Sequence, residues 1–209
     1  MTQQLSADLY ATTSTSPEAP LSGFYVERQR ANAATKVFDD KAEARFEMLL
    51  NIFKVFGHTP ELVTVFTDMI MAILKDSEID WVTKELLILK ASHRNECQYC
   101  LVQHETLSKR LGISEENIAD IGGDRYETSP HFTEGEKALM GLTVQIGVDA
   151  NDLSEDLWKR LHANFTEPQI VEAVFTITIY IAVSKFGDAL GVELEPVFSG
   201  LDPILKVKH

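Results

Sequence analysis

The sequence predicts an all-α protein of roughly eight helices. Three observations support this fold class: apolar residues recur at helical spacing through most of the chain after residue 38, capping residues precede these runs, and glycine or proline separates them. The 209 residues suit one large domain or two small ones, and a single buried core is comfortable at this length. Because Ser, Thr and Pro dominate residues 12–20, we expect an extended arm over 1–38 and a helical domain over 39–209.

In the first half, each predicted helix begins at a capping residue or a proline and ends near a glycine or a polar turn. Asp39 or Asp40 can cap the first helix, which Gly57 ends, and Pro60 takes the first position of the second. The apolar residues of that second helix follow i, i+3, i+4, i+7 spacing. The predicted spans are 39–57, 60–73, 80–90, 97–112 and 114–122.

Two capping boxes define the helices of the second half. Residues 133–136 (Thr-Glu-Gly-Glu) and 166–169 (Thr-Glu-Pro-Gln) each precede an apolar run, and residues 154–163 between them predict one more amphipathic helix. Residues 173–183 are rich in β-branched side chains and, taken alone, would fit a strand. We favour a buried helix there, because the capping box and the length of the run both fit one.

The charge of the chain is strongly acidic, which makes some partners improbable. There are 32 acidic against 19 basic residues, a net charge of −13, so the surface should repel nucleic acid and anionic lipid. The N-terminus lacks the basic and apolar regions of a secretory signal. The longest apolar stretch, 170–183, is interrupted by Glu172 and is shorter than the ~20 residues that a membrane span needs. We therefore expect a cytoplasmic protein without nucleic-acid or membrane partners.

The residues with the clearest chemistry are the two cysteines of the chain. Cys97 and Cys100 stand three residues apart, and His104 follows four residues after the second. At the start of a helix these three side chains share one face, where the helix dipole favours a thiolate and histidine can take or return a proton. Thiols at this spacing can close a disulfide. The pattern predicts a dithiol redox site, with Cys100 as the attacking thiolate, since His104 lies one turn from it, and Cys97 as the resolving thiol.

Glu85 lies twelve residues before Cys97, inside an apolar run. On a helical wheel it shares the apolar side with Trp81 and Ile88, where a carboxylate is costly unless it is hydrogen-bonded. Two interpretations of Glu85 remain open. It is either a buried proton acceptor or orienting group for His104, or a surface glutamate on a helix whose boundaries differ by a residue or two from those assumed.

Other uses of the two cysteines are less favoured. A structural zinc site would need the cysteines, His104 and either His93 or Glu85, but usual zinc modules place the second ligand pair on a separate segment. A thioredoxin-like site needs a βαβ context, which the helical sequence lacks. Two reduced core cysteines without function are also possible in principle, although a histidine one turn after a CxxC is unusual by chance.

Together, Glu85, eleven residues, Cys97-Gln-Tyr-Cys100, three residues and His104 resemble the signature of the carboxymuconolactone decarboxylase superfamily, in its alkylhydroperoxidase AhpD-like branch. The resemblance implies an AhpD-like helical domain and an antioxidant peroxidase that needs no cofactor or metal. In such a peroxidase Cys97 and Cys100 cycle between dithiol and disulfide, while Glu85 and His104 relay protons. The best-studied branch has a further histidine between its cysteines, where this chain has Tyr99, so the peroxide and the reductant stay open. The decarboxylase branch lacks the cysteine pair, which argues against lactone decarboxylation.

The partners implied are a peroxide substrate, a thiol or dithiol reductant of lipoyl, thioredoxin or glutathione type, and further copies of the chain. The apolar residues of the arm, Leu21, Phe24, Tyr25 and Val26, give a second reason to expect a homo-oligomer, because they need a surface to cover them. The alternative hypotheses are a non-catalytic redox-sensing or ligand-binding oligomer and a carboxymuconolactone decarboxylase-like enzyme.

Overall fold

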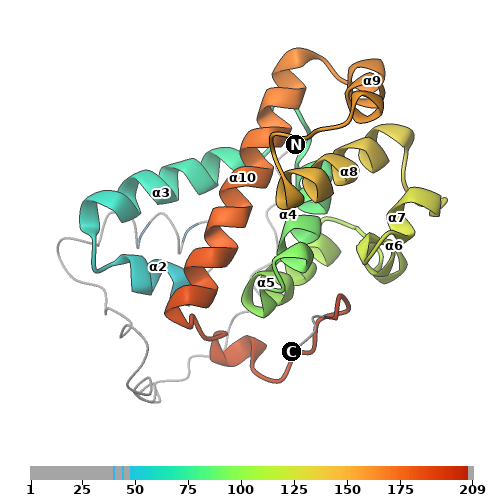
Figure 1. Cartoon of the computed structure of the whole chain (residues 1–209). Helices are drawn as coiled ribbons and strands as arrows, with labels where there is room; N and C mark the ends of the chain where they lie inside the picture. Colours follow the sequence, from blue (N-terminus) through green and yellow to red (C-terminus); the bar gives the residue numbers. More distant parts are fainter. Residues whose placement is uncertain (1–39, 41–43, 45–47, 207–209) are drawn as a thin grey trace. The chain divides into compact units, whose positions relative to one another are not determined.

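The computed structural model describes residues 40, 44 and 48–206. Within them the secondary structure is nine α-helices and one 3₁₀ helix, with no strand, so the all-α prediction is confirmed (Figure 1). The arm over 1–38, with its apolar residues, lies outside the described residues. The helices are α2 Asn51–Phe56, α3 Pro60–Ile73, α4 Trp81–Arg94, α5 Gln98–Arg110, α6 Glu115–Ile121, α7 Arg125–Thr128, α8 Glu134–Val148, α9 Glu155–Asn164 and α10 Glu167–Leu190, followed by the 3₁₀ helix Pro196–Phe198.

The structure differs from the sequence-based expectation at two helix boundaries and in one additional helix. The first predicted helix is not continuous: Asp40 and Ala44 are helical, but Leu50 is extended (φ −65°, ψ 148°) and α2 begins after it. The third helix continues past Lys90 to Arg94, and the four-residue α7 was not predicted because it is too short to show a period. The apolar run at 173–183 lies within α10, which confirms the helical interpretation over a strand.

Side-chain caps account for most helix starts. The predicted box at Thr133 and Glu136 is complete, with both reciprocal hydrogen bonds present. At Thr166 the Gln169 side chain accepts from the backbone N–H at 2.9 Å, as in one half of a box. Three further helices begin at a residue whose side chain accepts a backbone N–H two or three positions on: Asp80, Ser114 and Ser154.

The described chain divides into two compact units. One contains the residues up to Ala72 together with 190–200. In it, the Phe66 ring of α3 lies 4.2 Å from that of Phe56 and 5.9 Å from that of Phe53, both on α2. The backbone N–H of Asn51 donates to the Glu195 carboxylate at 2.6 Å, which ties the start of α2 to the segment after α10.

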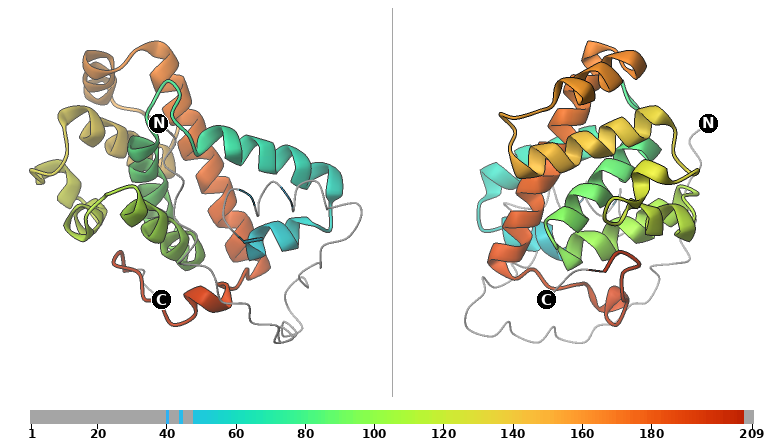
Figure 2. Two further views of the ribbon diagram at one scale, coloured as in Figure 1. Left: turned by 180° about the vertical axis from the view of Figure 1, so that it is seen from behind. Right: turned by 45° about the vertical axis from the view of Figure 1, so that its right-hand side comes forward.

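The second unit, Ile73–Ala189 with the segment from 201 onward, holds the cysteine pair and is built around α4. α4 packs against α5 and α8, and α8 packs against α9 (Figure 1; Figure 2, right). One apolar cluster joins α4, α8, α9 and α10, with Leu87, Leu139 and Ile177 fully buried in it. A second cluster joins α4, α5, α6 and α8 through Leu89, Leu101 and other residues.

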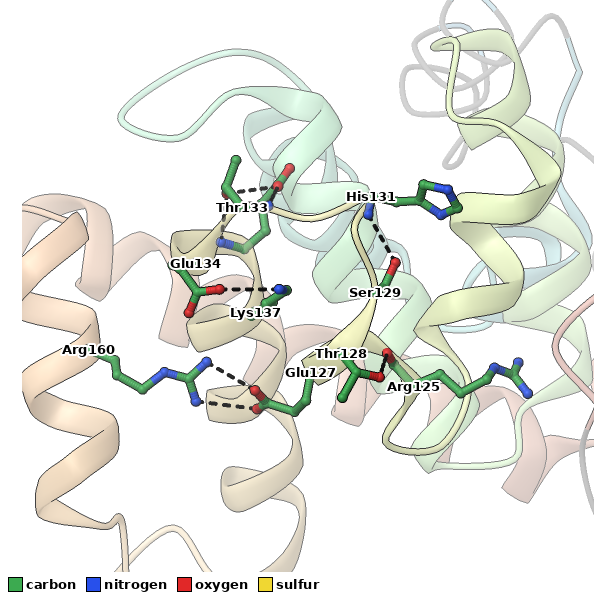
Figure 3. Close-up of polar contacts among 10 residues, drawn as sticks. Arg125, Glu127, Thr128, Ser129, His131, Thr133, Glu134, Lys137 and Arg160 are labelled. Carbon is green, nitrogen blue, oxygen red and sulfur yellow. Dashed lines mark hydrogen bonds and ion pairs between the residues drawn. The ribbon is translucent and has the colours of Figure 1, made fainter.

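Among the ion pairs that connect helices of this unit, two involve α9 and α10. Lys84 on α4 is fully buried, and its ammonium donates to the Glu172 carboxylate on α10 at 2.9 Å and to the Ser77 hydroxyl at 2.6 Å. Arg160 on α9 donates to both carboxylate oxygens of Glu127 on α7, at 3.1 and 3.3 Å (Figure 3). The first of these pairs holds α10 beside α4, which matters for the site described below.

α10 is long and apolar enough, by length and composition, to cross a membrane. The apolar run judged from the sequence, 170–183, is shorter than the helix, which spans Glu167–Leu190. In the structure Ile170, Ala173 and Ile177 of this helix pack into the core cluster of the second unit. A core helix passes the same test of length and composition, so this helix alone is weak support for a membrane span.

Lys90 on α4 is the second buried lysine of this unit, with 1% of its surface exposed. Its ammonium donates to the carbonyl of Ile121 at 2.8 Å and to that of Gly123, at the end of α6, and lies 4.2 Å from the centre of the Tyr126 ring. Burial lowers the pKa of Lys90 to about 8, partly opposed by the charge of Asp124. The Lys90 ammonium therefore connects α4 to the C-terminal end of α6, where the last carbonyls have no partner within the helix.

We expect Lys90→Met to lower the free energy of unfolding by about 2–3 kcal/mol near neutral pH, because two carbonyls lose their donor. The pKa of Lys90 falls from 10.5 to about 8 on folding, so between these values the unfolded chain holds more protons. The wild type should therefore gain stability as pH rises through this window, and the variant should lack that gain. Urea titrations at several pH values measure both effects. Lys109→Met, which breaks an exposed pair with Glu115, is the control and should change little.

Candidate functional site

The turn between α4 and α5 sets the backbone around the cysteines. The N–H of Glu96 donates to His93 O and the N–H of Cys97 to Ser92 O, each at 3.1 Å, which is the hydrogen-bond pattern of a Schellman C-cap. Glu96 has φ 58°, the left-handed conformation in which glycine is usual. Cys97, immediately after it, is the N-cap residue of α5. The first cysteine is thus shared by the end of one helix and the start of the next.

The two sulfurs lie side by side at the start of α5. The Cys97 thiol donates to Cys100 Sγ at 3.1 Å, and both cysteines are free rather than joined in a disulfide. Cys97 is 0% exposed and Cys100 2%. The predicted proximity of the pair is therefore present in the structure, and a disulfide would need the sulfurs to approach by only about 1 Å more.

The environment makes the two thiols unequal. The hydrogen bond from Cys97 lowers the pKa of Cys100, and burial opposes this, while the charge of His104 and a hydrogen bond from Ser184 lower it further. The same Cys97–Cys100 hydrogen bond raises the pKa of Cys97 far above its usual value, and burial adds to the rise. Cys97 therefore holds its proton more tightly than Cys100 does, and the role of Cys100 as the attacking thiolate stays a prediction.

Glu85 is fully buried on α4 and joins this site through His104. One carboxylate oxygen lies 2.8 Å from Nδ1 of His104, and the other accepts the indole N–H of Trp81 at 3.1 Å. The spacing left two interpretations of Glu85 open. The structure supports the one in which Glu85 is buried and orients His104. Burial disfavours a charged His104, but the Glu85 carboxylate and Cys100 outweigh it and raise the pKa of His104 above 6.5.

α10 contributes the third side of the site. The Tyr180 ring meets the His104 ring edge-on, with centroids 4.9 Å apart and an interplanar angle of 85°. The Ser184 hydroxyl, one turn later on the same helix, donates to Cys100 Sγ at 3.6 Å. Burial and the charges of Glu85 and Cys100 raise the pKa of Tyr180 well above 10, so its hydroxyl stays protonated beside the site.

The sequence comparison covers the part of the chain that holds all four predicted site residues. The model of the carboxymuconolactone decarboxylase family matches residues 60–144. This region is therefore similar to the carboxymuconolactone decarboxylase family. The uncharacterized protein YdfG of Bacillus subtilis (strain 168) is 24% identical over 133 residues, which cover 63% of this chain and 88% of that protein.

Two solved structures relate this family region to the AhpD-like fold. An uncharacterized peroxidase-related protein from Silicibacter sp. TM1040 matches with a TM-score of 0.75 and 15% identity, covering 88% of this chain and 97% of that one. An alkylhydroperoxidase AhpD core from Ralstonia eutropha JMP134, also described as an uncharacterized peroxidase-related protein, matches with a TM-score of 0.69 and 15% identity, covering 78% and 86% of the two chains. At these identities the likeness establishes the fold, which is all-helical and AhpD-like.

One other polar cluster in the part of the chain that the structure describes can be compared with known kinds of site. Among the described residues, no group of three or more His, Cys, Asp and Glu side chains is placed to hold a metal ion. Ser129, His131 and Asp120 come together, but both Ser129 Oγ and His131 Nδ1 contact the same Asp120 oxygen, at 2.7 and 3.1 Å. His131 uses only its backbone N–H toward Ser129, so it is not placed as the base of a serine nucleophile (Figure 3).

Proposed function

We propose that the protein is a CxxC-dependent thiol peroxidase that reduces hydrogen peroxide or an alkyl hydroperoxide through a dithiol–disulfide cycle. The observation that carries the proposal is the pair of free sulfurs 3.1 Å apart, beside the buried Glu85–His104 pair. The match of residues 60–144 to the carboxymuconolactone decarboxylase family and the AhpD-like fold support it.

In the oxidative half of the cycle, the Cys100 thiolate attacks the nearer peroxide oxygen and the O–O bond breaks. Cys100 becomes a sulfenic acid, and the departing alkoxide or hydroxide takes a proton to leave as alcohol or water. Cys97 then gives up its proton and attacks the Cys100 sulfur, which forms the disulfide and releases water. A dithiol reductant of lipoyl or thioredoxin type, or two molecules of a monothiol such as glutathione, returns two electrons and two protons, so that both thiols reform and the reductant becomes a disulfide.

His104 supplies the proton for the departing oxygen in this scheme. Its pKa is raised above 6.5, which favours the protonated ring, and Glu85 contacts the ring at Nδ1. Nε2 is then the nitrogen that can donate to the departing oxygen. The His104 side chain is 12% exposed, whereas Glu85 is sealed from solvent, so the histidine is the member of this pair that exchanges protons with the outside.

Steady-state peroxide consumption is the direct test. We expect turnover of hydrogen peroxide or an alkyl hydroperoxide with at least one of the lipoamide, thioredoxin and glutathione systems. One equivalent of peroxide should remove both free thiols without intermolecular cross-links, and dithiothreitol should restore them. Oxidation of one equivalent without turnover in any system would instead support the redox-sensing alternative, and loss of a single thiol would contradict the disulfide cycle. The homo-oligomer and the cytoplasmic location remain predictions.

A further inference from the structure

Ser184 is a buried hydroxyl on α10, one turn before Asp188, whose charge raises the pKa of Cys100. It is 0% exposed, and it lies on the face of the helix that also buries Ala173, Ile177 and Tyr180. Its hydroxyl is directed at Cys100 Sγ, 3.6 Å away, within the distance that a sulfur acceptor allows. An alanine would fill nearly the same space without a polar atom to desolvate, so the packing alone gives no reason for a serine here.

The partner of this hydroxyl differs from that of several other helical hydroxyls among the described residues. Thr106, Thr143 and Thr178 donate to the backbone carbonyl four residues earlier, at 2.8, 3.1 and 2.9 Å, which is the usual solution within a helix. Ser184 instead donates across the helix interface to a side chain 84 positions away in sequence. The ion pair between the buried Lys84 and the half-buried Glu172 connects the same helix to α4.

We propose that Ser184 is a further catalytic residue of the thiol centre, whose hydroxyl stabilises the sulfur of Cys100 as a thiolate by a hydrogen bond. This inference rests on the proposed dithiol chemistry, and it adds a group that lies outside the CxxC segment. In the reduced protein Cys97 is the other donor to Cys100. Cys97 loses its proton when it attacks, so it cannot serve as a donor through the whole cycle, whereas Ser184 keeps its hydroxyl throughout.

The step that depends most on Ser184 is the reduction of the disulfide. A reductant thiolate attacks Cys97 Sγ, the S–S bond breaks, and Cys100 leaves as a thiolate with the electron pair. At that moment Cys97 is bound to the reductant and has no thiol proton to donate. A leaving thiol of lower pKa departs faster, so the Ser184 hydrogen bond should speed this step.

The test measures the ionisation of Cys100 without any peroxide. In a Cys97→Ala background Cys100 is the sole cysteine, and its thiolate is followed by ultraviolet absorbance against pH, with the variant lacking both cysteines as blank. Adding Ser184→Ala should move the midpoint upward by roughly half to one pH unit, which corresponds to a roughly 3- to 10-fold smaller thiolate fraction below the midpoint. Thr176→Val, which removes another buried hydroxyl of α10, is the matched control and should leave the midpoint unchanged.

Circular dichroism confirms that each variant is folded before the titration. An unchanged midpoint in Ser184→Ala, or an equal shift in Thr176→Val, would overturn the assignment. A shift confined to Ser184→Ala supports it, even if the wild type consumes no peroxide, so failure of the proposed peroxidase activity can be told apart from failure of this inference.

Discussion

Replacing Cys100 by serine should abolish peroxide turnover, by about three orders of magnitude or more, because the variant has no ionised sulfur to attack the O–O bond. Cys97→Ser should also stop the cycle, but only after one oxidation step, which leaves Cys100 as a sulfenic acid. The two variants therefore differ in their products: mass spectrometry should find one added oxygen on Cys97→Ser and an unmodified thiol on Cys100→Ser.

Alkylation rates separate the two thiols without relying on peroxide. The pKa of Cys100 is lowered by the hydrogen bond from residue 97, which a serine can still donate, and by His104 and Ser184. Burial and the nearby Asp188 side chain still raise the pKa of Cys97 when Cys100 is absent. Near neutral pH we expect Cys97→Ser to react with iodoacetamide at least about tenfold faster than Cys100→Ser. Faster reaction of Cys100→Ser would reverse the roles of the two cysteines.

Glu85→Gln should have the second largest effect, a loss of turnover of roughly two orders of magnitude. Glutamine keeps the shape of the side chain but removes the charge that raises the pKa of His104. Its single oxygen can accept from either Trp81 or His104, and its NH₂ then faces the other donor, so a destabilisation of about 1–3 kcal/mol should accompany the loss. Turnover against pH and urea unfolding measure the two effects.

The Glu85–His104 pair also gives a pH dependence of stability with a defined sign. The folded pKa of His104 lies above 6.5, so its contribution is fully present below pH 6.5 and is lost as pH rises through the raised value. Glu85→Gln should remove this dependence. Trp81→Phe, which leaves the carboxylate in place, is the matched control and should retain most of the turnover. Unchanged turnover in Glu85→Gln would return Glu85 to a purely structural role.

The local part of the site could be predicted because it follows helical spacing. The cysteines, His104 and Glu85 lie on two consecutive helices, and their separations along the chain were enough to suggest a shared face. The state of Glu85 was left open, because a wheel drawn from sequence does not show which neighbour reaches the carboxylate. The structure settles its position through contacts at 2.8 and 3.1 Å.

The contribution of α10 could not be predicted in the same way. Tyr180 and Ser184 meet the site through tertiary packing, and no local spacing connects them to residues more than 75 positions earlier. The sequence pattern of α10 is that of an ordinary buried helix. The break at Leu50 was missed for a related reason: the apolar run continues through it, while the contact that fixes the start of α2 comes from Glu195, far along the chain.

The turn at Glu96 limits how far the backbone would move between the dithiol and disulfide states of the proposed cycle. The Cys97 amide is already bonded to Ser92, and the chain on either side belongs to a helix, so the small approach of the sulfurs needs only side-chain rotation. Oxidation would then leave the backbone of both helices where it is. A partner that binds the two states differently would then have to respond to the lost thiolate charge near His104, because the backbone of the two helices would be the same in both states.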